Sequence, residues 1–481
     1  MNRESFCFLD FLCQSFQFDC IISVKNLPRS PPSDRIGVQR FFDRISTTMS
    51  ERIGSRRHAH ALSAMSVRNR NGNPVLFLCV VGFLGDEGEG YMKKLLALWM
   101  AALVLMTGCG QKSAENEPSN KKEAQTSEAG ETSRFQTTFY DTFDTVVSAI
   151  VYASSEEEAN DYFETIHKRY QELDHLYSSF KNYDGIVNVK SINDQAGKGK
   201  VVVDKELYDL LRFSKDQYEK YGETNIAFGA VTSIWQSYRD AYEVVPEAER
   251  TADDEALKKG LPDAKIPTME ELQAANKHTN IDDIVLNDED HSVEIKDPEL
   301  KIDVGAVAKG YATELIGEEL RASGLETALI SAGGNVKIIG SAPEAERNSF
   351  GIGLQNPEAI TGDGSAEENM KDIIYTNDTS VVTSGDYQRY YIVKGKHYHH
   401  LIDPDTLMPA DHFRSVTIVT KDSGLADFLS TTAFCLPYEK GRALIDSLDG
   451  VEAYWIFKDG STAFTDGLKN KLDSQGATNA Q

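Results

Sequence analysis

Two stretches decide the fold of this chain: Asp303-Val304-Gly305-Ala306-Val307-Ala308-Lys309-Gly310-Tyr311 and Ala426-Asp427-Phe428-Leu429-Ser430-Thr431. In the first, small residues turn the end of a strand into a helix, and apolar residues at helical spacing predict that helix over residues 307–322. Lys309 falls in its first turn, where the helix dipole disfavours a cation and attracts an anion. We therefore expect an anion-binding helix terminus; the alternative is a solvent-exposed Lys309 with Asp303 capping the helix.

The second stretch places a carboxylate and a hydroxyl on one side of a helix. Asp427 and Thr431 are four residues apart, so they share a helix face, and Ser430 lies beside them. Hard oxygen ligands of this kind suit Mg²⁺, which leaves coordination positions for phosphate oxygens. We expect Asp427 to be half exposed, so that its loss would spare the fold. The alternative is a helix-terminal acid and a threonine that bonds back to the main chain.

Two further segments carry candidate chemistry. His400 stands near the end of a strand, before Asp403-Pro404, where it could act as a general base near neutral pH; the alternative is a purely structural histidine. The glycine-rich segment 331–335 lets main chain approach a ligand closely. It matches neither the Walker nor the dinucleotide-binding pattern, so it is a weak phosphate signal.

Between residues 134 and 472 the chain alternates strand-like and helix-like segments, with several hairpins. This pattern predicts an α+β fold with mixed, largely antiparallel sheets in a single large domain, rather than a doubly wound sheet. Residues 473–481 are short, polar and free of aliphatic periodicity, which predicts a disordered tail.

The first 133 residues have a different character. Residues 1–91 contain ten Arg and one Lys, whereas residues 92–481 contain ten Arg and 29 Lys. We interpret residues 1–91 as a non-native extension from an upstream start; a genuine extension is the alternative. Residues 92–108 read as a lipoprotein signal peptide that precedes a lipidated Cys109, against the alternative of an uncleaved anchor. Residues 109–133 then form a disordered tether.

Charge and cysteine content limit the partners. The formal net charge is −25, which argues against nucleic acid as a partner and means that any polyanionic ligand must be bound by a local arrangement of charges. Of the six cysteines, only Cys109 and Cys435 lie beyond residue 91. We expect Cys435 to be a core residue and expect no disulfide framework.

Taken in order, these segments resemble the ApbE family of FAD:protein FMN transferases, formerly called thiamine biosynthesis lipoproteins, across residues 134–470. The resemblance implies an ApbE-like fold related to the T-fold, with Mg²⁺ held by the Ala306 carbonyl, Asp427 and Thr431, and with Ser430 adjacent. It also implies a set of residues that contact FAD: Phe143, Phe180, Ala227, Phe228, Gly229, Asp303, Lys309 and the Leu401 main chain. The matching motifs are Phe143–Thr145, Asn193-Asp194, Ile226–Gly229, Asp303–Tyr311, Ala332–Gly334, Ser384–Tyr387, His400–Pro404 and Ala426–Thr431.

The implied reaction transfers FMN from FAD to a Thr or Ser hydroxyl of an exported protein and releases AMP, with Asp427 acting through the metal and His400 accepting the hydroxyl proton. The implied acceptor resembles exported subunits of membrane electron-transfer complexes. The expected location is the extracytoplasmic face of a bacterial membrane, reached through the lipid on Cys109. Two rivals remain open: a Mg²⁺-dependent FAD pyrophosphatase that yields FMN and AMP, and a non-catalytic flavin-binding lipoprotein.

Overall fold

The computed structural model describes residues 60–68, 74–82, 132–242, 260–343, 348–359 and 369–478. The chain divides into two compact units, residues 1–124 and 125–481. In the first unit, β1 (His60–Arg68) and β2 (Pro74–Gly82) form an antiparallel hairpin. The predicted signal peptide, Cys109 and nearly all of the predicted tether lie outside the described residues. Within the described part, no helix has both the length and the apolar composition required to cross a bilayer.

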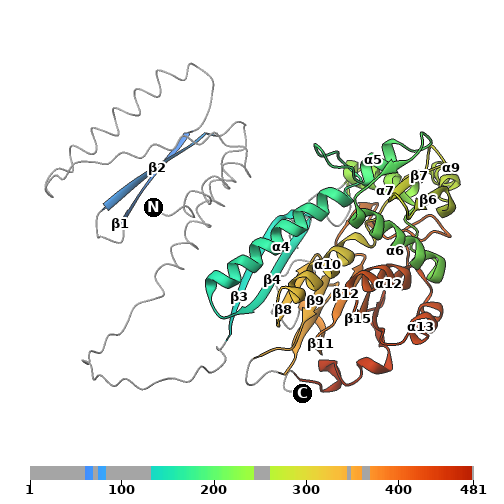
Figure 1. Cartoon of the computed structure of the whole chain (residues 1–481). Helices are drawn as coiled ribbons and strands as arrows, with labels where there is room; N and C mark the ends of the chain where they lie inside the picture. The colour runs from blue at the N-terminus through green and yellow to red at the C-terminus, as the bar shows by residue number, and fades with distance from the viewer. Residues whose placement is uncertain are drawn as a thin grey trace, which may run out of the picture. The chain divides into compact units, whose positions relative to one another are not determined.

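The second unit is built on an eight-stranded sheet (Figure 1) with the order β17-β16-β15-β12-β9-β8-β4-β3, in which all neighbouring strands are antiparallel. The prediction of a largely antiparallel α+β fold is confirmed. The strands are β3 (Ser133–Thr142), β4 (Thr145–Ala153), β8 (Ala328–Ala332), β9 (Asn335–Ile339), β12 (Ser380–Gly385), β15 (Phe413–Thr420), β16 (Glu452–Phe457) and β17 (Thr462–Phe464).

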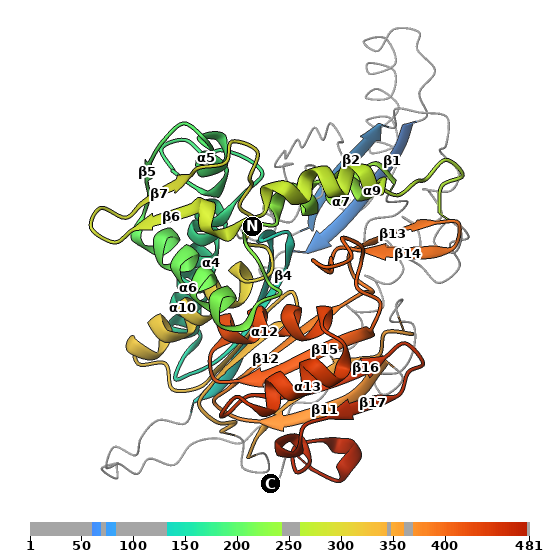
Figure 2. The same cartoon turned by 90° about the vertical axis from the view of Figure 1, so that its right-hand side faces the viewer.

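Helices cover one face of this sheet because the strands alternate buried and outward residues. In β4, Val147, Ala149 and Val151 are fully buried and join the main core cluster, whereas Val146 is exposed. The covering helices are α4 (Glu156–Tyr177), α10 (Ala308–Ala322), α12 (Ser423–Cys435) and α13 (Tyr438–Asp446), and Figure 2 shows α12 and α13 lying along strands β12, β15 and β16.

A smaller core cluster joins the sheet to a hairpin of β10 (Phe350–Gln355) and β11 (Met370–Thr376). The remaining elements form satellite structures around the large sheet. They are α5 (Val189–Asp194), α6 (Lys205–Tyr221), α7 (Gly229–Tyr242), α9 (Met269–Ala275), the small sheet of β5 (Val201–Val202), β7 (Ser292–Ile295) and β6 (Ile284–Asn287), and the hairpin of β13 (Tyr390–Val393) and β14 (Lys396–His399).

The prediction of a disordered tail from residue 473 was wrong as far as residue 478. A short 3₁₀ helix, η5 (Asp473–Gln475), is held because the Ser474 hydroxyl donates to Asp372 Oδ2 at 2.6 Å. Ala477 is also buried. A hydrogen bond to a residue about one hundred positions earlier holds a segment whose own composition favours disorder.

Several strands start or stop at the same end of the large sheet. The register pairs Val147 with Ala332, Ala332 with Asn335, and Asn335 with Val382, so β4 and β9 begin where β8 and β12 end. The Gly333-Gly334 turn between β8 and β9 therefore lies at the same end of the sheet as the last residues of β12. The hydroxyl groups of Ser430 and Thr431 lie near this end of the sheet, next to Ser384 of β12.

Candidate functional site

The N-terminus of α10 leaves one carbonyl oxygen unused. No side chain caps this helix at Val307. The Gly310 N–H donates to Asp427 Oδ2 at 2.8 Å, instead of to the Ala306 carbonyl that an α-helix would use. No residue in the described part of the chain hydrogen-bonds to the Ala306 carbonyl oxygen. The structure thus leaves this oxygen available as a ligand.

Helices α10 and α12 meet at Gly310 with no room for a side chain. A Cβ atom at this position would lie 2.3 Å from the Ser423 carbonyl oxygen and 2.4 Å from Asp427 Cβ. Because real Cβ atoms do not approach other heavy atoms this closely, only glycine lets the two helices bring Asp427 to the α10 main chain.

Asp427 is buried, which corrects the expectation of a half-exposed ligand. Only 4% of its surface is exposed, and the Lys309 Nζ lies 3.9 Å from its Oδ2. Burial raises the pKa of the Asp427 carboxyl, while Lys309, the Gly310 N–H and the Asn335 side chain oppose that rise. The carboxylate therefore supports the junction of two helices as well as facing Lys309.

Three hydroxyl groups lie together, two of them on the helix that carries this carboxylate. Ser384 Oγ, from the end of β12, lies 2.8 Å from Ser430 Oγ and 3.4 Å from Thr431 Oγ1. Ser430 Oγ also donates to the Asp427 main-chain oxygen at 2.9 Å. The structure therefore brings Asp427, Ser430 and Thr431 together as predicted. Sequence reasoning gave Ser384 no role, although its Ser-Gly-Asp-Tyr segment was noted as a motif.

The donor set suits a hard cation. Among the described residues no group of three or more His, Cys, Asp or Glu side chains could hold a metal ion, so softer or ligand-rich sites are not formed there. One carboxylate, one unused carbonyl and neighbouring hydroxyls match Mg²⁺, which uses few protein ligands and keeps positions for water or phosphate oxygens. The residues present fit a magnesium ion.

Asp303 is fixed from two sides but does not cap α10. Its Oδ1 accepts the Gly305 N–H at 2.9 Å, and its Oδ2 accepts the Thr232 hydroxyl of α7 at 2.6 Å. The preceding residue, Ile302, is held by the Asn193 side chain, which accepts its N–H at 2.7 Å and donates to its carbonyl at 2.9 Å. Asn193 therefore orients the segment that carries Asp303, which follows an isolated bridge at Lys301 and is not the end of a strand as the sequence suggested.

Two adjacent histidines have different surroundings. His399 is buried: its Nε2 donates to the Ala410 carbonyl at 2.9 Å, its Nδ1 accepts the Leu401 N–H at 3.2 Å, and burial lowers its pKa to about 4. His400, in contrast, is exposed. Desolvation there lowers the pKa of His400 well below its ordinary value, and the nearby cation of Arg389 lowers it further.

The tautomer of His400 follows from one contact. Its Nδ1 lies 3.3 Å from the Arg389 carbonyl oxygen, and a carbonyl can only accept, so Nδ1 carries the proton. The neutral ring therefore keeps its lone pair on Nε2. This is the arrangement that a general base requires, and the role of His400 stays a prediction.

The predicted flavin contacts lie on several elements. Phe143 sits in the β3–β4 turn with its ring against Tyr170 and Tyr177, whereas Phe180 follows α4 with 67% of its surface exposed. The structure records no contact between Phe180 and the other predicted residues.

Ala227, Phe228 and Gly229 are buried at the start of α7, and the Gly229 N–H donates to the Lys301 carbonyl at 3.1 Å. The Leu401 N–H and carbonyl both have protein partners, His399 and Ala410. A ligand would therefore compete with protein partners for the Leu401 main chain.

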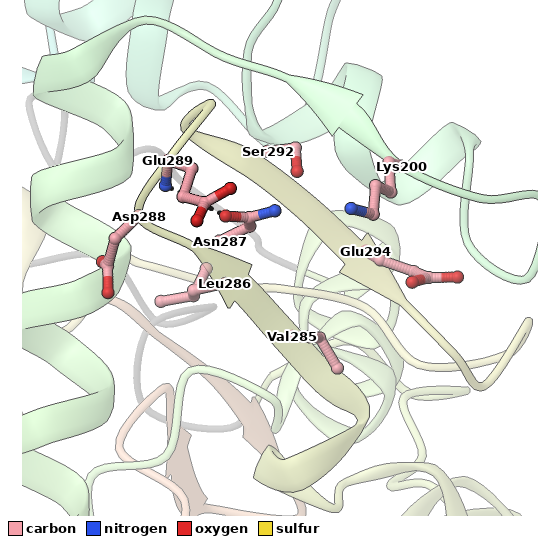
Figure 3. Close-up of a pocket in the computed structure, with 8 residues that line it drawn as sticks. All are labelled: Lys200, Val285, Leu286, Asn287, Asp288, Glu289, Ser292 and Glu294. Carbon is pink, nitrogen blue, oxygen red and sulfur yellow. Dashed lines mark hydrogen bonds between the residues drawn. The ribbon is translucent and has the colours of Figure 1, made fainter.

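A separate pocket on the small β5-β7-β6 sheet contains none of these residues (Figure 3). Its polar lining comes from Lys200, Asn287, Asp288, Glu289, Ser292 and Glu294. Acidic side chains dominate this lining and would repel a diphosphate, so we place the candidate site at the α10–α12 junction instead.

Known proteins resemble this chain in both sequence and fold. An FAD:protein FMN transferase of Treponema pallidum (strain Nichols) is 32% identical over 290 residues, which cover 59% of this chain and 74% of that protein. One of Klebsiella pneumoniae (strain 342) is 28% identical over 292 residues, covering 59% and 81%.

Solved structures show the same likeness. The crystal structure of the ApbE protein from Thermotoga maritima superposes with a TM-score of 0.57 at 26% identity, over 70% of this chain and 98% of that one. The flavin transferase ApbE from Vibrio cholerae, at 20% identity, shares the fold with a TM-score of 0.56 over 71% of this chain and 100% of its own. The model of the ApbE family matches residues 143–455, which is more than half of the chain. This chain therefore belongs to the ApbE family.

Proposed function

We propose that this chain transfers FMN from FAD to a hydroxyl group of a protein, in a Mg²⁺-dependent reaction that releases AMP. The observation that carries the proposal is the junction of α10 and α12, where the Asp427 carboxylate accepts the Gly310 N–H and lies 3.9 Å from the Lys309 Nζ. The names of the Treponema and Klebsiella relatives, both FAD:protein FMN transferases, support the same reaction.

Mg²⁺ would be held by the Ala306 carbonyl, Asp427 and Thr431. Ser430 and Ser384 would orient the Thr431 hydroxyl. A metal ion bound there supplies positive charge to the oxygens of a diphosphate. The protein's own share is to fix the Asp427 carboxyl, because the Gly310 N–H donates to it and Lys309 lies nearby; both contacts oppose the rise in pKa that burial causes.

Lys309 and the uncapped N-terminus of α10 are suited to the remaining phosphate charge. Phosphoryl transfer depends chiefly on positioning and charge stabilisation, since a protein has little covalent work to perform. The N-terminal N–H groups of a helix favour an anion, and Lys309 lies in the first turn of α10. The conflict noted in the sequence, a cation at the positive end of a helix, is partly relieved by Asp427 and would be relieved further by a diphosphate.

His400 is suited to take the proton of the attacking hydroxyl. Its ring is neutral at pH 7 because its pKa lies well below the ordinary value, and its proton sits on Nδ1. Nε2 can therefore accept a proton as the acceptor oxygen attacks the phosphorus that carries the FMN group, while AMP leaves from the opposite side.

Of the three predicted aromatic contacts, Phe180 offers the most open ring face. Phe143 already packs against Tyr170 and Tyr177, and Phe228 is buried. A flavin or adenine ring can stack on the exposed face of Phe180, and its binding would draw the loop after α4 to the site.

The acceptor and location are part of the proposal as well. The lipoprotein signal at residues 92–108 and Cys109 support a lipid-anchored enzyme on the extracytoplasmic face of a bacterial membrane. An acceptor at that location is an exported protein with a suitable Thr or Ser, and a subunit of a membrane electron-transfer complex fits this description.

The test uses the purified full-length chain with FAD, Mg²⁺ and an acceptor domain that carries a flavinylation-type threonine. The intact mass of the acceptor should rise by one FMN phosphoester, and EDTA should abolish the gain. Free FMN and AMP with an unmodified acceptor would identify the pyrophosphatase. Unchanged FAD after prolonged incubation would identify a flavin-binding lipoprotein. The Asp427→Asn variant serves as the inactive control because it keeps the size of the side chain.

A further inference from the structure

Arg389 contacts both the β3–β4 turn and His400. It lies between β12 and β13, and its guanidinium donates to the Asp144 carbonyl at 2.8 Å across 245 positions of sequence. The same guanidinium lies 3.5 Å from Asp144 Oδ2. Its own carbonyl accepts the Nδ1 proton of His400 at 3.3 Å. One residue therefore connects the β3–β4 turn to the candidate base.

The turn that Arg389 holds has an unusual backbone. Phe143 and Asp144 both have positive φ values, 52° and 49°, in the left-handed region that residues other than glycine seldom adopt. The Phe143 N–H donates to Asp174 Oδ1 of α4 at 3.1 Å, which secures the turn from the other side. The position of Phe143 thus depends on contacts from α4 and from Arg389.

Arg389 is also the least compensated cation near His400. The charged groups that act on the His400 ring are Arg389, Arg239 of α7 and Lys309 of α10, besides the neighbouring His399. Lys309 faces buried Asp427, and Arg239 pairs with Asp240 at 3.4 Å. The Asp144 carboxylate facing Arg389 is 96% exposed, so water screens it and leaves more of the arginine charge to act on the ring.

We propose that Arg389 is a positioning residue that fixes the Phe143–Asp144 turn through its side chain and orients the His400 ring through its main chain, with Nε2 as the proton-accepting nitrogen. Its main chain selects the tautomer, and its side chain supplies the charge that disfavours the imidazolium. The catalytic importance of Arg389 rests on the proposed function, in which His400 takes a proton from the acceptor hydroxyl. The contacts of Arg389 with Asp144 and His400 do not depend on that proposal.

The experiment is a pH titration of the histidine side chains by ¹⁵N NMR on the full chain, with His400 assigned through a His400→Asn variant. Wild-type His400 should show the Nδ1–H tautomer and a low pKa. Arg389→Met should raise that pKa by about one pH unit, because a nearby cation is lost. The tautomer should persist, since the main-chain carbonyl is unchanged. Arg389→Lys, which keeps the charge, should leave the pKa near its wild-type value.

The matched control is Arg212→Met. Arg212 has a similar exposure, 34% against 36% for Arg389, and it also pairs with an exposed aspartate, Asp288. Its loss should leave His400 unaffected. A purely structural role for Arg389 would lower thermal stability without moving the His400 titration.

The outcomes separate this inference from the proposed function. An Nε2–H tautomer in the wild type, which needs no variant, would overturn the inference, as would an unchanged His400 pKa in folded Arg389→Met. If the wild type modifies its acceptor, the acid limb of the pH–rate profile should shift to higher pH in Arg389→Met. It should stay in place in Arg212→Met. If the wild type transfers no FMN while the NMR shifts appear as expected, the proposed function fails and the assignment of Arg389 stands.

Discussion

Replacing Gly310 with alanine tests the contact that assembles the site. The new methyl group would lie 2.3 Å from the Ser423 carbonyl oxygen, 2.4 Å from Asp427 Cβ and 3.1 Å from Asn335 Oδ1. The two closest atoms are a main-chain oxygen and a Cβ atom, neither of which can swing aside, so the helices α10 and α12 must separate. Separation stretches the hydrogen bond from the Gly310 N–H to Asp427, which is 2.8 Å long in the wild type.

The expected cost has two opposing parts. Overpacking of a tight contact costs about 1–3 kcal/mol, whereas alanine is favoured over glycine inside a helix by about 1 kcal/mol. The net loss of stability should therefore be about 0–2 kcal/mol, and the variant should fold. Activity should fall much further, by roughly 100-fold, because a displacement of about 1 Å suffices to misalign reacting groups.

Urea denaturation and the acceptor mass assay measure the two effects separately. The control is Gly441→Ala in α13, where the nearest neighbours of a new Cβ, an oxygen and a Cα of Ala433, lie at 3.4 and 3.8 Å. That substitution should keep full activity and leave stability equal or slightly higher. Wild-type stability together with undiminished transfer in Gly310→Ala would refute the close approach of α10 to Asp427.

Four further outcomes follow from the same contacts. Asp427→Asn should lower Mg²⁺-dependent transfer by roughly 100-fold or more while metal-free FAD binding persists, as followed by flavin fluorescence; equal loss of FAD binding would contradict the metal role. Lys309→Met should weaken FAD binding about tenfold, measured by the same signal, because it removes a charge-assisted contact. Phe180→Ala should raise the Kd for FAD about threefold to tenfold without changing Tm, since the ring is exposed. Burial lowers the pKa of His399 to about 4, against about 6.5 when unfolded, so the unfolded state binds the proton more tightly. Stability should accordingly decrease as pH falls from about 6.5 to 4, by up to about 3 kcal/mol, and urea titrations of His399→Gln should lack this slope.

The helical parts of the site could be predicted because their signals are local. The spacing of Asp427 and Thr431 places both on one helix face whatever the rest of the chain does. The small residues before Lys309 likewise predict a turn into a helix, and α10 begins at Ala308 as expected to within one residue. Metal and phosphate candidates on one helix or one turn are therefore within reach of sequence reasoning.

The burial of Asp427 was missed although the sequence contained a sign of it. Helix α12 carries no other charged residue between Ser423 and Cys435, and nearly every position in it is buried. A helix without a polar face lies within the core, so its one carboxylate had to be buried and partnered. The expectation of a dispensable surface ligand overlooked this pattern.

Arg389 and Ser384 could not be assigned from sequence because their partners are remote. Arg389 binds Asp144 across 245 positions, and Ser384 meets Ser430 across 46. Both lie in or just after β12, and only the register of the sheet brings that strand end to the site. Pairings of this kind are set by tertiary packing, for which a single sequence has no periodic signal.

The charge distribution resolves the apparent conflict between an acidic chain and a diphosphate ligand. With a net charge of −25, the distant field repels FAD, but at physiological salt such a field is largely screened beyond about 8 Å. Within the site, the cations of Lys309, Arg239 and Arg389 all act on His400, and the carboxylate nearest to Lys309 is the buried Asp427. Lys309 and Arg239 are partly buried, with 21% and 17% of their side chains exposed, so at short range their effect exceeds that of distant, screened surface acids. We therefore expect the site to attract a diphosphate, because its few cations act at short range and Lys309 and the Gly310 N–H partly offset the charge of the buried Asp427 carboxylate.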